Sequence, residues 1–87
     1  MQEDVVRLRQ KINEIDEQIV RLLNDRAEAA QHIGKAKAKT GAEVYDPNRE
    51  RYVLERIDQL NKGPLSKGAI EEVYACIMTA CRELQMP

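Results

Sequence analysis

The sequence has few aromatic residues: three tyrosines occur without any phenylalanine or tryptophan. Any core therefore has to be built from Leu, Ile, Val and Ala. A chain of 87 residues buries only about 60% of the surface that its unfolded form exposes. A core this thin rarely holds a rigid pocket within one chain, which favours oligomerisation.

Long apolar runs and an excess of one charge are also lacking. No stretch approaches the ~20 apolar residues that a membrane-spanning helix needs, and the opening segment MQEDVVRLRQ is charged where a signal peptide would be apolar. Fourteen basic and 15 acidic residues leave a net charge of −1. We therefore expect a cytoplasmic protein that binds neither nucleic acid nor a membrane.

Cysteine and histidine are too scarce for a disulfide framework or a metal site. Cys76 and Cys81 are five residues apart, about 140° around a helix, so they cannot pair with each other. The chain has one histidine and no CxxC motif. We expect no metal and no cofactor.

A helical repeat of apolar residues dominates the first half of the chain. From Val5 to Ala36 the pattern alternates spacings of three and four residues, which is a heptad seam. This pattern predicts one long helix over residues 3–39.

Two shorter helices are predicted to follow. Asp46 before Pro47 is a typical helix start, with Asp as N-cap and Pro at the first helical position, and predicts a helix over residues 47–62. Ser66 predicts the cap of a third helix over residues 67–85. Strand-like alternation is absent from the sequence, so we expect an all-α fold with one long and two short helices.

The predicted lengths constrain the architecture. At 1.5 Å per residue the long helix measures ~55 Å and the short ones ~24 and ~28 Å. One chain could place the short helices end to end along the long one, but this would cover only one side of the seam. We therefore predict that residues 1–87 form one domain of an intertwined helical homodimer.

Arg26 stands out because it occupies a seam position where Leu or Ile is expected. A charge there is costly unless something pairs with it, and no carboxylate lies three or four residues away. Two interpretations stay open: a small anionic ligand, or a carboxylate from another helix or another chain, such as Glu50. Arg9 and Lys37 also lack an acidic partner at helical spacing, although Lys37 lies in a lysine-rich run.

Three segments together resemble the AroQ-class chorismate mutases: LRQKINEID (8–16), LLNDRAEAAQHIGKAK (22–37) and VYDPNRERYVLERI (44–57). The resemblance spans nearly the whole chain. Cys81 stands where some members of that family have Ser. The residues that match active-site positions of the family are Arg9, Arg26, Lys37, Asp46, Arg49, Glu50 and Gln85.

The resemblance implies the rearrangement of chorismate to prephenate, in phenylalanine and tyrosine biosynthesis. This one-substrate pericyclic reaction needs a reactive conformer held in place and support for negative charge on the ether oxygen. By the resemblance, Lys37 and Gln85 would donate hydrogen bonds to that oxygen. Glu50, with the turn from Asp46 to Arg49, would hold the ring hydroxyl.

By the same resemblance, Arg9 and Arg26 would bind the two substrate carboxylates. They are 17 residues apart, or ~25 Å along one straight helix. They cannot hold one small ligand from the same chain. We therefore predict that Arg9 acts on the site of the partner chain, across an antiparallel pair of long helices.

Two alternatives stay open. One is a lyase on the same scaffold that eliminates pyruvate from isochorismate. The other is a non-catalytic dimerisation or regulatory module, although a pure zipper would place an apolar residue or Asn at position 26. Because the chain ends just past the third predicted helix, fusion to a further enzyme domain also stays open.

Overall fold

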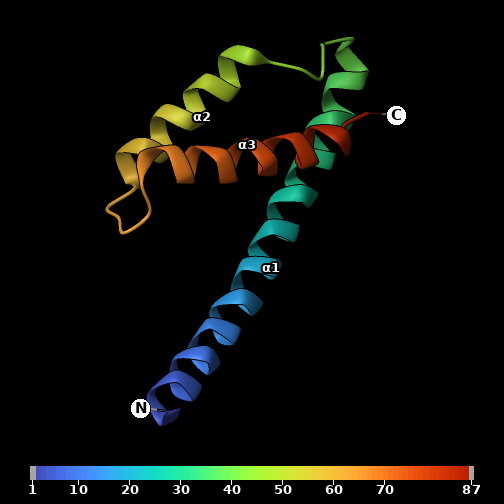
Figure 1. The fold of residues 1–87 in the computed structure, drawn as a ribbon. Helices are drawn as coiled ribbons and strands as arrows, with labels where there is room; N and C mark the ends of the chain where they lie inside the picture. Colours follow the sequence, from blue (N-terminus) through green and yellow to red (C-terminus); the bar gives the residue numbers. More distant parts are fainter. Residues whose placement is uncertain (1, 87) are drawn as a thin grey trace.

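The computed structural model describes residues 2–86 as three α-helices (Figure 1). These are α1 (Gln2–Thr40), α2 (Pro47–Leu60) and α3 (Lys67–Glu83). None of them is long and apolar enough to cross a membrane. Residues 2–86 contain no strand, so the all-α prediction of one long and two short helices is confirmed.

The two short helices begin at the predicted caps. The Asp46 side chain accepts a hydrogen bond from the Arg49 backbone N at 3.1 Å, with Pro47 in the first helical turn. The Ser66 hydroxyl accepts one from the Ala69 backbone N at 3.1 Å. Each cap satisfies a backbone N–H that has no partner within its helix.

Both short helices end before the predicted residues 62 and 85. Asn61 has an extended backbone (φ −74°, ψ 114°). Its side chain accepts from the Gly63 backbone N at 3.0 Å and donates to the Leu65 carbonyl at 2.9 Å. These bonds favour a turn over a further helical residue. Helix α3 ends at Glu83, and Gln85 lies in the turn that follows it.

The two short helices form a hairpin, and the last turns of α3 cross the C-terminal part of α1 (Figure 1). The two short helices therefore do not lie end to end along α1. The connection over residues 61–66 reverses the chain, so that α3 runs back beside α2. Small residues allow α3 to approach α1 closely, and the buried positions are Ala30, Gly34, Met78 and Cys81.

The first part of α1, residues 2–25, which we call the arm, is exposed along its whole length. The radius of gyration is 16.4 Å, against ~12 Å for a compact chain of this length. The accessible surface is 7328 Å², against ~5,200 Å² for a compact protein of this mass. The arm leaves a large apolar stripe uncovered, formed by Val5, Leu8, Ile12, Ile15, Ile19 and Leu22.

Candidate active site

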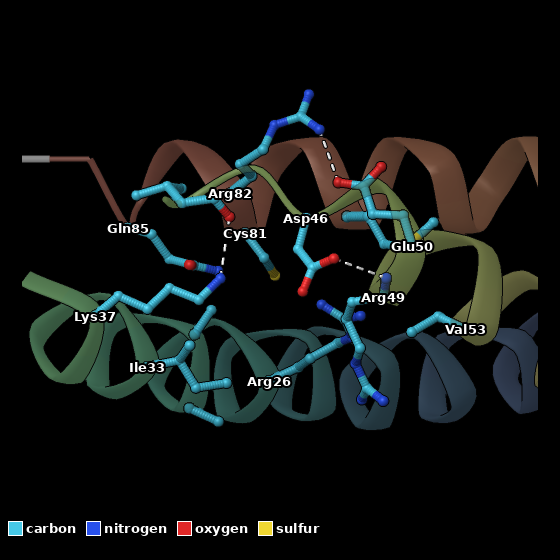
Figure 2. A pocket seen from close by; sticks show the side chains of 14 residues that line it. Arg26, Ile33, Lys37, Asp46, Arg49, Glu50, Val53, Cys81, Arg82 and Gln85 are labelled. Carbon is cyan, nitrogen blue, oxygen red and sulfur yellow. Dashed lines mark hydrogen bonds and ion pairs between the residues drawn. The ribbon is translucent and has the colours of Figure 1, made fainter. Parts of the chain in front are cut away.

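A pocket of about 260 Å³ lies where α1, the start of α2 and the end of α3 meet (Figure 2). Seven of the eight residues singled out from the sequence line it. The eighth, Arg9, lies on the arm, outside the pocket of its own chain. The seven are Arg26, Lys37, Asp46, Arg49, Glu50, Cys81 and Gln85.

Helix α1 supplies two cations to the pocket. Arg26 and Lys37 are separated by three helical turns and share one face of the helix. Arg26 is partly buried and forms no ion pair with any carboxylate of residues 2–86. Lys37 donates from Nζ to the Val44 carbonyl at 3.1 Å. The alternative in which Glu50 neutralises Arg26 is therefore wrong for this chain.

The N-terminus of α2 places three charged side chains at the pocket. Asp46 caps the helix, and Arg49 and Glu50 lie in its first turn. The cap fixes the direction in which this turn enters the site, and the helix dipole favours the two carboxylates there. The Arg49 guanidinium lies 5.0 Å from the ring centroid of Tyr52.

Gln85 reaches the pocket from the turn after α3, next to Gly34 of α1. A Cβ added at Gly34 would lie 2.8 Å from Gln85 Cα and 3.1 Å from Gln85 O. Only glycine allows this approach, because any side chain at position 34 would meet the Gln85 backbone. The Gln85 Oε1 is buried and has no hydrogen-bond partner within residues 2–86. Such an atom is costly, which makes this end of the pocket suited to a polar ligand.

Sequence reasoning missed Arg82, which also lines the pocket. Its Nη1 donates to Glu50 Oε2 at 2.7 Å. Arg82 meets one of the two criteria that identified Arg26, because no carboxylate lies three or four residues from it, but it does not interrupt an apolar seam. The residues at those positions are Met78, Thr79, Gln85 and Met86.

The charged residues that line the pocket carry an excess of two positive charges. Four are cationic, and Asp46 and Glu50 are anionic. The rest of the wall is largely apolar, with Ala29, Ile33 and Val53 among its residues, so the cations act in surroundings of lower polarity than bulk water. Such a site suits a small ligand with two negative charges and an apolar body.

Comparison with known proteins agrees with this geometry. The family described as chorismate mutase type II matches residues 8–86. A bifunctional chorismate mutase/prephenate dehydratase of Aquifex aeolicus is 40% identical over 87 residues, covering 95% of this chain and 24% of that protein. The protein of the same name from Neisseria gonorrhoeae is 46% identical over 79 residues, covering 91% of this chain and 21% of that protein.

A solved structure has the same fold. The chorismate mutase of Thermus thermophilus (form II) superposes with a TM-score of 0.91 at 30% identity, covering 93% of this chain and 92% of that one. The resemblance inferred from the sequence segments is thus confirmed. This chain spans about a quarter of the length of the bifunctional relatives.

Proposed function

Because the chain belongs to the chorismate mutase type II family, we propose that it rearranges chorismate to prephenate, in the biosynthesis of phenylalanine and tyrosine. One observation carries the proposal. Seven side chains selected from the sequence, from three separate helices or their ends, line a single pocket. Its excess of two positive charges matches a dicarboxylate substrate.

In the proposed complex, Arg26 binds one substrate carboxylate. It forms no ion pair within residues 2–86, so its guanidinium can offer two parallel donors to an incoming carboxylate. Glu50 accepts from the ring hydroxyl, and the capped turn from Asp46 to Arg49 positions that carboxylate. Cys81 lies buried in the wall, beside the bound substrate.

Lys37 and Gln85 donate hydrogen bonds to the ether oxygen whose bond to carbon breaks. Negative charge grows on this oxygen in the transition state, so fixed donors stabilise the transition state more than the substrate. The Lys37 ammonium carries three donor hydrogens, and one is engaged by Val44. The pocket holds the substrate in the reactive conformer, which removes much of the entropic part of the barrier.

We also propose that the working unit is an intertwined homodimer in which Arg9 completes the partner's pocket. The exposed arm supports this, because its apolar stripe lacks cover within residues 2–86. A second hollow of about 330 Å³ lies between α1 and α3 beside the stripe, with Leu23, Ile77 and Leu84 in its wall. An antiparallel partner helix would cover both surfaces and carry its Arg9 towards Arg26.

The bifunctional relatives support a further proposal, that this chain acts as the mutase domain of a longer protein. The size of the natural protein, detected by an antibody against this domain, tests it. A product of the mass of this chain alone, 10.0 kDa, would contradict it.

The central experiment is an assay of chorismate loss with prephenate identified as the product, with isochorismate tested in parallel. We expect conversion of chorismate by the purified protein without an added metal or cofactor. Release of pyruvate from isochorismate, with chorismate left intact, would favour the lyase and contradict the proposal.

Subunit mixing tests the shared site. Arg9→Ala and Arg26→Ala proteins should each be nearly inactive, whereas their mixture after subunit exchange should regain about one quarter of the activity, because hybrid dimers hold one intact site. A mixture of Arg26→Ala and Lys37→Ala is the matched control. These residues serve the same pocket of one chain, so no hybrid site is intact. Equal recovery in both mixtures, or in neither, would contradict the shared site.

A further inference from the structure

Arg82, near the end of α3, contacts both the first turn of α2 and the loop between α1 and α2. Its guanidinium donates to Glu50 Oε2 on α2 at 2.7 Å. Its Cζ lies 4.7 Å from the ring centroid of Tyr45, in the loop between α1 and α2. The side chains of Arg82 and Glu50 are 26% and 29% exposed, so this is a largely desolvated, charge-assisted pair.

The pair lies on the side of the pocket away from Arg26 (Figure 2). Only one Glu50 oxygen, Oε2, is bonded to Arg82, and Oε1 accepts no hydrogen bond within residues 2–86. The guanidinium therefore fixes the carboxylate and leaves one oxygen available to a ligand hydroxyl. It also offsets a negative charge that would otherwise repel a dianionic substrate.

The loop before α2 is held at two successive residues. Lys37 donates to the Val44 carbonyl at 3.1 Å, and Arg82 lies over the ring of Tyr45. Asp46, the next residue, caps α2 and lines the pocket. Restraint of this loop therefore carries directly into the position of the first turn of α2.

We propose that Arg82 is a positioning residue for substrate recognition: it orients the Glu50 carboxylate and holds the loop through Tyr45 without contacting the substrate. This inference rests on the proposed chorismate mutase function. The hydroxyl contact of Glu50 is made in both substrate and transition state, so its loss appears mainly in KM.

The test is a double-mutant cycle of Arg82→Met and Glu50→Gln, assayed with chorismate. Arg82→Met should raise KM about tenfold with kcat changed less than about twofold. In the Glu50→Gln background the same change should raise KM clearly less, since the charged pair is already lost and only the contact of Arg82 with Tyr45 remains. Arg82→Lys, which keeps the cation, should restore most of the lost affinity.

Arg51→Met is the matched control, since it removes an exposed guanidinium one residue from Glu50 and should leave KM unchanged. Circular dichroism melts confirm that each variant is folded at the assay temperature. An equal rise of KM in both backgrounds would show that Arg82 contacts the substrate itself and would overturn the inference. An unchanged KM in Arg82→Met, with chorismate still converted, would overturn it while leaving the proposed function intact. A protein that does not convert chorismate at all would overturn both.

Discussion

The two parts of α1 carry the same heptad pattern but have different surroundings. From Arg26 onward the helix packs against α3 and lines the pocket, with Ala30 and Gly34 buried. The arm, residues 2–25, is exposed throughout. An apolar seam therefore specifies which face of a helix needs cover, and it does not specify whether the cover comes from the same chain.

Side-chain size explains the difference. In the pocket part, small residues let α3 come close enough to bury its own Met78 and Cys81. In the arm, the seam is built from large residues such as Ile12, Ile15 and Ile19. Branched side chains of this kind suit packing between parallel or antiparallel helices. The arm thus has the composition of an interface between chains. The part of α1 from Arg26 onward has the composition of a contact within one chain.

The largest effect is expected from a charge on the arm, in Ile12→Glu. Burying an isoleucine is worth about 1.5–3 kcal/mol, and a carboxylate in the same place is costly. Since the proposed dimer carries the change twice, its dissociation constant should rise at least about 100-fold. Sedimentation equilibrium should show monomers, and chorismate conversion should be lost although the pocket residues are intact.

The matched control for this variant is Gln10→Glu, on the outer side of the same helix. Ile12 and Gln10 are both exposed in the single chain. A monomeric protein would therefore tolerate the two changes alike. If Ile12→Glu forms dimers and converts chorismate as well as Gln10→Glu does, the apolar stripe of the arm is not a dimer interface.

A smaller effect is expected at the pocket itself, from Gln85→Glu in the turn after α3. The amide of Gln85 donates a hydrogen bond at any pH, whereas a glutamic acid donates only when protonated, below a reference pKa of about 4.3. Activity of the unaltered protein should stay nearly constant through neutrality. The variant should lose about 10–100-fold at neutral pH and recover as the pH falls. A pH profile identical to that of the unaltered protein would show that Gln85 does not contact the ether oxygen.

The smallest effect is expected from Gly34→Ala, where the two helices meet. The added Cβ would lie 2.8 Å from Gln85 Cα, so Gln85 must shift, and kcat/KM should fall about tenfold. Overpacking costs about 1–3 kcal/mol, partly offset by about 1 kcal/mol of helix propensity. The net loss of up to about 2 kcal/mol should lower the melting temperature by up to about 8–16 °C.

Gly68→Ala is the control for that variant, because a Cβ at Gly68 meets no atom within 4 Å. Its kinetics should be unchanged, and its stability equal or slightly higher. If Gly34→Ala kept full activity, the contact between Gly34 and Gln85 would have no part in placing the amide.

Local signals in the sequence predicted much of the fold. The caps at Asp46 and Ser66 depend on short-range geometry and lie where they were expected. The ends of α2 and α3 were less predictable. The end of α2 depends on hydrogen bonds that the Asn61 side chain forms within a turn. The free energies of this turn and of a slightly longer helix differ little, so the sequence does not fix the last residue of the helix.

The candidate site was predictable where a charge broke an apolar pattern or a motif matched the family. Arg26 and Lys37 fall in this class, and both line the pocket. Arg82 lies outside the matched segments, and its partner Glu50 is 32 residues away in sequence. Which carboxylate an arginine meets depends on how the helices cross.

The sequence by itself determined three helices, their apolar faces and a set of unpaired cations, because these follow from periodicity, capping and composition within a few residues. Only the tertiary structure decided that α2 and α3 fold back as a hairpin, that Glu50 pairs with Arg82 and leaves Arg26 unpaired, and that Gly34 lies against Gln85. These contacts join residues far apart in the chain, and their geometry comes from the packing of whole helices.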